Sequence, residues 1–118
     1  MKKDRTYQIP ETREPEVLAN FNHTRPVAEQ FKRNVQLAVQ SCNVSFRTFF
    51  KVLQANGVKM TREAWYCDRM NRFPSLLYIG TFSRLLGIET HYLLRSDFTD
   101  LLQNGEIKPS ILGIHRQE

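Results

Sequence analysis

The chain has 118 residues, the length of one domain with short tails, and its 41% hydrophobic and 25% charged residues are typical of a folded protein. No apolar run approaches the roughly 18 residues of a membrane span, and no apolar segment follows the N-terminal lysines as in a secretory signal. Two cysteines are too few for a disulfide framework, which favours a reducing, cytoplasmic location.

The net charge of +5 is concentrated in the middle of the chain. Residues 1–22 are neutral overall, and residues 73–118 carry four basic and five acidic groups. Residues 23–72 carry nine basic and three acidic groups, a net charge of +6. Such a segment is typical of a protein that binds a polyanion. An ordinary solvated basic face is the alternative, and the localisation of the charge favours nucleic acid.

Residues 1–22 are expected to form an N-terminal arm, because Pro10 and Pro15 interrupt any helix there. Basic arms can reach into a minor groove of DNA. Four acidic groups share this segment, however, and they favour a terminus without a role in binding.

The first helix is expected to begin at Thr24-Arg25-Pro26, because proline is tolerated in the first turn of a helix. It continues to about Ser41. Its apolar residues recur at spacings of four, four and three and so share one stripe, which predicts a helix with a single buried side. The residues of this stripe are Val27, Phe31, Val35 and Ala38.

A second, basic helix follows a short connector. Ser45 is a favourable N-cap for it, and the turn signal Asn56-Gly57 ends it. Two helices joined by a glycine-containing turn are a candidate helix-turn-helix. The apolar residues that predict the buried side of the second helix are Phe46, Phe49, Phe50 and Leu53.

A third helix is expected to start at Arg62, capped by Thr61, and to stop before Phe73-Pro74. At about 100° per residue its small apolar residues share one face and its basic and aromatic residues the other. Such a helix suits a groove of nucleic acid. Trp65 lies on the flank, where half-burial against the second helix is expected. The inner face comprises Met60, Ala64, Cys67 and Asn71. The outer face comprises Arg62, Tyr66 and Arg69.

Three further helices are expected after this one. Ser75 caps a helix to Leu86, in which Gly80 suggests a close approach by another helix. The apolar residues that predict its inner face are Leu76, Ile79, Phe82, Leu85 and Leu86. A fifth begins at Thr90, and Ser96 caps a sixth, DFTDLLQ. The tail carries apolar residues that either pair with a second copy of the protein or fold back on their own domain, and the sequence favours neither. These residues are Ile111, Leu112 and Ile114.

The predicted fold class is all-α: a compact five- to six-helix bundle with a helix-turn-helix, a flexible N-terminal arm and an extended C-terminal tail. The expected organisation is an arm over 1–22, a DNA-binding domain over 23–95, and a C-terminal helix and tail over 96–118 as a candidate dimerisation segment.

The order of these signals from Phe31 to Leu94 resembles the Cro/CI-type (lambda-repressor-like) helix-turn-helix family of bacterial and phage regulators. Upstream, the apolar positions of the first helix and the cap of the second also fit. Phe50 departs from the family, which has a small alanine there, and residues 54–56 lengthen the second helix. The match is densest at Pro74, Ser75, Leu76, Leu86, Gly87, Ile88, Leu93 and Leu94.

The resemblance implies a sequence-specific regulator that binds double-stranded DNA, a repressor acting as a homodimer on an inverted repeat. Arginine can pair with guanine and glutamate can accept from cytosine, whereas neighbouring residues hold phosphates. The residues implied in base reading are Lys59, Thr61, Arg62, Glu63, Tyr66 and Arg69. The residues implied in phosphate binding are Ser45, Arg47, Lys51, Asn71 and Arg72.

The alternative function is a protein-interaction module on the same scaffold, similar to an antitoxin or a phage antagonist, with the arm or tail binding a protein partner. No catalytic set stands out, because the three histidines are scattered and neither cysteine has a second cysteine at metal-ligand spacing. We therefore expect no enzyme activity, no cofactor and no metal.

Overall fold

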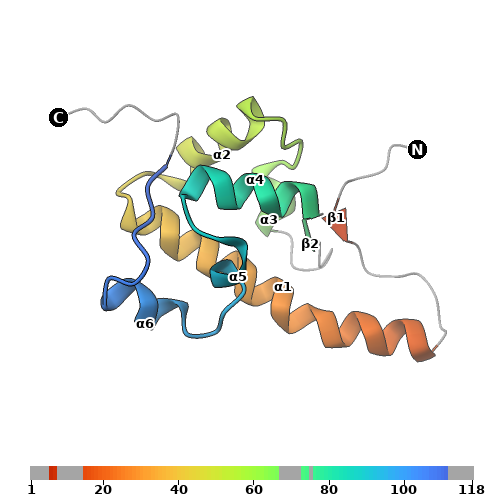
Figure 1. Cartoon of the computed structure of the whole chain (residues 1–118). Coiled ribbons are helices and arrows are strands. Elements are labelled where there is room, and N and C mark those ends of the chain that lie inside the picture. The colour runs from red at the N-terminus through yellow and green to blue at the C-terminus, as the bar shows by residue number, and fades with distance from the viewer. Residues whose placement is uncertain (1–5, 8–14, 67–72, 75, 112–118) are drawn as a thin grey trace.

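The computed structural model of the protein describes residues 6–7, 15–66, 73–74 and 76–111 (Figure 1). These residues fold as a helical protein, as the sequence predicts. None of the helices in these ranges combines the length and the apolar character needed to cross a membrane. The elements in chain order are β1 (Thr6–Tyr7), α1 (Pro15–Ser41), α2 (Phe46–Ala55), α3 (Arg62–Tyr66), β2 (Phe73–Pro74), α4 (Leu76–Leu86), α5 (Thr90–Leu93) and α6 (Phe98–Gln103).

Helix α1 is longer than expected. It begins at Pro15 and continues through Pro26 to Ser41, so the predicted start at Thr24 is wrong. Pro15 stands at the first helical position, where its missing N–H costs nothing. Pro26 removes one hydrogen bond inside the helix, but it is exposed, so its ring meets solvent rather than a neighbouring element. An interior proline weakens a helix without always ending it. The N-terminal part of α1 extends beyond the other helices (Figure 1).

Two residues of the predicted arm form a strand instead. Thr6 lies opposite Pro74 and Tyr7 opposite Phe73 in a short antiparallel pair. The pairing places β1 beside β2, which lies between α3 and α4 in the chain (Figure 1). No strand was expected, because a two-residue strand has no alternating pattern that a sequence can reveal.

Helix α2 confirms its predicted cap and buried side. The Ser45 hydroxyl accepts a hydrogen bond from the Thr48 amide at 3.0 Å, which satisfies one of the free donors at the helix start. Phe49, Phe50 and Leu53 are buried, whereas Phe46 is half-buried. The basic side chains of α2 therefore face outward.

The core lies where α1, α2, α4, α5 and α6 meet. The predicted stripe of α1 is buried at Phe31, Val35 and Ala38, but Val27 remains 42% exposed. Helices α5 and α6 contribute Leu93 and Phe98, which are fully buried.

Asn34 is the buried polar residue that ties α1 to α5. Its side-chain amide donates to the backbone carbonyls of Leu93 at 2.9 Å and Arg95 at 2.8 Å. Its carbonyl oxygen accepts from Gln30 at 2.8 Å. Both carbonyls lie at the end of α5, where no further turn of helix supplies N–H partners. Asn34 therefore caps a short helix from a distant part of the chain.

Helix α4 presents Ile79, Phe82, Leu85 and Leu86 to the core, as predicted. The expected close approach at Gly80 is wrong: Gly80 is exposed, and a Cβ added there meets no atom within 4 Å. No packing requirement therefore explains a glycine in the middle of this helix.

The C-terminal segment corrects one predicted cap. Helix α6 begins after Asp97 rather than Ser96, and the Asp97 carboxylate forms no cap because it binds Arg95. Beyond α6 the chain folds back on its own domain: Ile107 is buried, and Ile111 packs partly buried against the core. The remaining apolar tail residues, Leu112 and Ile114, lie outside the described residues.

Replacing Gly80 with alanine should raise the free energy of unfolding by about 0.5–1 kcal/mol, because alanine favours a helix and the site has open space. Urea denaturation measures the change. Gly57→Ala is the matched control and should destabilise the protein, since Gly57 has a φ of +92° that alanine adopts only with strain. A loss of stability in Gly80→Ala contradicts the prediction.

Asn34→Ala should lower the free energy of unfolding by about 2–4 kcal/mol, because it removes the donor to the buried Leu93 carbonyl and to the part-buried Arg95 carbonyl. Thermal and urea denaturation measure the loss. Gln30→Ala removes the amide that donates to Asn34 and the carbonyl that accepts from the exposed Arg33, both at the edge of the same network, and should cost less than about 1 kcal/mol. Equal losses for the two variants would show that Asn34 does not serve as the cap of α5.

Candidate nucleic-acid interface

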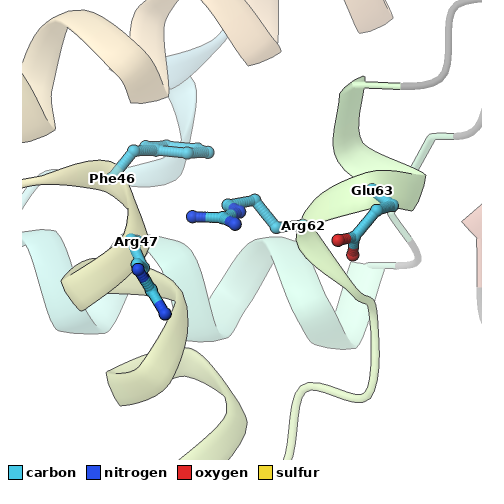
Figure 2. A pocket seen from close by; sticks show the side chains of 4 residues that line it. All are labelled: Phe46, Arg47, Arg62 and Glu63. Atoms are coloured by element: carbon cyan, nitrogen blue, oxygen red, sulfur yellow. The ribbon is translucent and has the colours of Figure 1, made fainter.

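An open hollow of about 480 Å³ lies between the start of α2 and the start of α3. The described residues that line it are Phe46, Arg47, Arg62 and Glu63. Figure 2 shows Arg62 extending from α3 toward Phe46 and Arg47 on α2, with Glu63 on the far side of Arg62. Each helix therefore contributes its first two residues to the same surface.

The turn between α2 and α3 creates this arrangement. Gly57 adopts a φ of +92°, and the Val58 amide then donates to the Leu53 carbonyl at 3.1 Å, which closes the end of α2. Val58 and Met60 are buried, and Lys59 between them is exposed. This alternation is that of an extended chain lying on the core, and it directs the start of α3 back toward the start of α2.

The turn is also held from α4. The Tyr78 hydroxyl accepts a hydrogen bond from the Lys59 amide at 3.0 Å, and Arg84 donates to the side-chain carbonyl of Asn56 at 3.0 Å. Tyr78 is buried and was not selected from the sequence, where it is one aromatic residue among many. Its position on α4, three residues before Thr81 and four before the buried Phe82, is the signal that places it near the core.

Trp65 fixes α3 to the body of the protein. It is 1% exposed, and its ring is stacked on Phe82, with 5.4 Å between the ring centroids. The rings of Phe46, Phe50 and Phe31 surround it at centroid distances of 5.5, 5.8 and 6.2 Å. The expected packing against the second helix is confirmed, and the expected half-burial is wrong because helices α1 and α4 also cover the ring.

Lys32 of α1 adds a polar contact to this anchor. Its ammonium group donates to the Trp65 carbonyl at 3.0 Å and lies 5.6 Å from the centroid of the indole ring. The indole N–H, in contrast, is buried without a hydrogen-bond partner in the described part of the chain. Leaving such a donor unpaired costs about 1–3 kcal/mol, which the burial of the large ring offsets.

The charged side chains at the hollow have no neutralising partner in the part of the chain that the structure describes. Among the described residues Arg47, Arg62 and Glu63 form neither an ion pair nor a hydrogen bond. Arg95 is different: its guanidinium donates to both Asp97 oxygens at 2.9 and 2.7 Å, and this pairing lowers the pKa of Asp97. The two arginines at the hollow therefore remain available to an anion.

The structure brings together three of the residues selected from the sequence, Arg47, Arg62 and Glu63. Lys51 is exposed and lies one helical turn after Arg47, so it faces the same side of α2. Lys59 and Thr61 are exposed on the approach to α3.

The other selected residues are placed less fully. The Ser45 hydroxyl is engaged with Thr48, to whose side-chain oxygen it donates at 2.8 Å. Tyr66 is the last residue of α3. The predicted start of α3 at Arg62 is confirmed, and so is the burial of Met60 on its inner side. Three selected residues lie outside the described residues: Arg69, Asn71 and Arg72. Cys67, which was expected on the inner face of α3, also lies outside them.

The described residues contain no group of three or more histidine, cysteine or acidic side chains that could hold a metal ion. No family model, curated protein or solved structure matches the chain. The resemblance to the Cro/CI-type family thus stays a prediction that rests on the order of the sequence motifs.

Trp65→Ala should lower the free energy of unfolding by about 3–5 kcal/mol, because it empties the aromatic site that holds α3. Circular dichroism during urea denaturation measures the loss. Phe46→Ala, at a half-buried position on the same site, should cost less. A change below about 1 kcal/mol in Trp65→Ala would show that α3 is held by other contacts.

Proposed function

We propose that the protein is a sequence-specific regulator that binds double-stranded DNA, with α2 and α3 as its helix-turn-helix. The observation that supports the proposal is the shared hollow at the starts of these helices, where Arg47 and Arg62 lie without an acidic partner among the described residues. Lys51 extends the basic surface along α2. A DNA duplex presents one negative charge per about 1.7 Å of its axis, and such a basic surface complements it.

In this proposal the start of α3 enters the major groove and α2 lies across the phosphate backbone. The protein acts as a homodimer on an inverted repeat whose half-sites are about 34 Å apart, one turn of DNA. Repression follows from occupancy, because a bound dimer excludes polymerase or a competing regulator from the same DNA.

The function is tested by selecting bound sequences from random duplex DNA with the full chain and then measuring the affinity for the selected duplex. Trp65 is the only tryptophan, so its fluorescence reports on the neighbourhood of α3 during titration. Retention on heparin or on random DNA at low salt should disappear as salt rises. If neither heparin nor any duplex is retained, the proposal is wrong and a protein-interaction module is favoured.

Lys51→Ala should weaken binding to all duplexes alike and reduce the slope of log affinity against log salt by about 1, because one phosphate contact is lost. The measurement is a titration between about 50 and 200 mM salt. Lys108→Ala is the matched control: it removes the same charge from an exposed position after α6 and should leave the slope unchanged. Equal effects of the two variants would indicate only a general charge effect.

A further inference from the structure

We infer that Arg47 and Arg62 hold one backbone phosphate of the DNA between them, so that Glu63 rather than Arg62 faces a base edge. The inference rests on the proposed function. It assigns phosphate binding to Arg62 and base contact to Glu63, the two residues at the start of α3. It revises the expectation that Arg62 reads a base.

The position of Arg62 is the first argument. Its side chain is half-buried and extends across the hollow toward the start of α2, where Phe46 and Arg47 lie (Figure 2). An arginine that reads guanine must present both of its donors to a base edge in the groove. Arg62 would have to leave the hollow to do so, whereas it already points at the place where a phosphate meets α2.

The chemistry of the hollow is the second argument. Arg47 and Arg62 bring two positive charges to one concave surface, and no described residue forms an ion pair with either. Like charges on one surface repel each other, and the apolar ring of Phe46 on the wall weakens screening by water. A phosphate diester offers oxygens that both guanidinium groups can bind in two-pronged fashion. One phosphate therefore satisfies both residues.

Glu63 supplies the third argument. It is exposed and has no ion pair among the described residues. A carboxylate repels phosphates, but Glu63 lines the hollow on the side of Arg62 away from Arg47 (Figure 2). A phosphate between the two arginines therefore avoids it, and the carboxylate suits the part of the interface that meets bases. There it can accept a hydrogen bond from the amino group of cytosine. With the shared phosphate fixing the position of α3 on the DNA, Glu63 contacts one base pair. We therefore predict a preference for a C·G pair at one position of each half-site.

The test compares Arg47→Ala, Arg62→Ala and the double variant of the full chain on the selected duplex and on single-base variants of it. Each single variant should lose about tenfold or more in affinity for all duplexes alike. The double variant should lose little more than either single variant, and its salt slope should fall by about 1 in total, because one phosphate is involved. Glu63→Gln should instead relax the preference at one base pair.

Four outcomes separate the possibilities. If Arg62→Ala relaxes the sequence preference at one base pair, the inference is wrong and Arg62 contacts a base. Independent losses that add in the double variant overturn the shared phosphate. Wild-type protein that binds no duplex overturns the proposed function itself. Wild-type protein that binds inorganic phosphate through both arginines but no duplex overturns DNA as the source of the phosphate. Thermal denaturation of every variant shows whether it is folded. Arg62→Gln removes the charge of Arg62 but keeps a long polar side chain, and so controls for the loss of packing in Arg62→Ala.

Discussion

The packing of Trp65 is the constraint on which the proposed interface depends. Helix α3 is described over Arg62–Tyr66, and a helix in a folded protein gains most of its stability from tertiary packing. Its position is set by one large ring that four phenylalanines from α1, α2 and α4 enclose. Because Trp65 follows Arg62 by three residues, the same contact that buries the ring directs the arginine toward α2. The core thus determines where the charges of the hollow lie.

Much of the fold is predictable because its signals are local. The cap at Ser45, the turn at Gly57 and the apolar face of α4 each depend on a few adjacent residues, and the structure confirms them. The incorrect predictions concern features that depend on residues outside a local stretch of the sequence. Pro26 weakens α1 without ending it, and β1 pairs with a strand far along the chain, so neither outcome is visible in a local window.

Three residues that line the hollow, Arg47, Arg62 and Glu63, had been selected from the sequence, but their geometry was not predictable. A helical wheel assigns Arg62 to the outer face of α3, and such a wheel does not include α2. The direction of the side chain depends on the turn between the helices, which Tyr78 holds through its hydrogen bond to Lys59. That contact joins residues far apart in sequence. Tertiary contacts of this kind decide whether an arginine faces a base or a phosphate.

The contrast between the arginines of this protein bears on what the hollow is for. Arg95 lies beside an acidic partner and Arg33 donates to Gln30, so these guanidinium groups are satisfied within the chain. Arg47 and Arg62 lie together without such a partner in the described part of the chain, although Glu63 is next in sequence. Grouping like charges lowers stability, and buried contacts such as those of Asn34 must offset it. Two arginines that lie at one surface without a partner among the described residues fit the anion that the proposed function places there, and the exposed carboxylate beside them limits where that anion can lie.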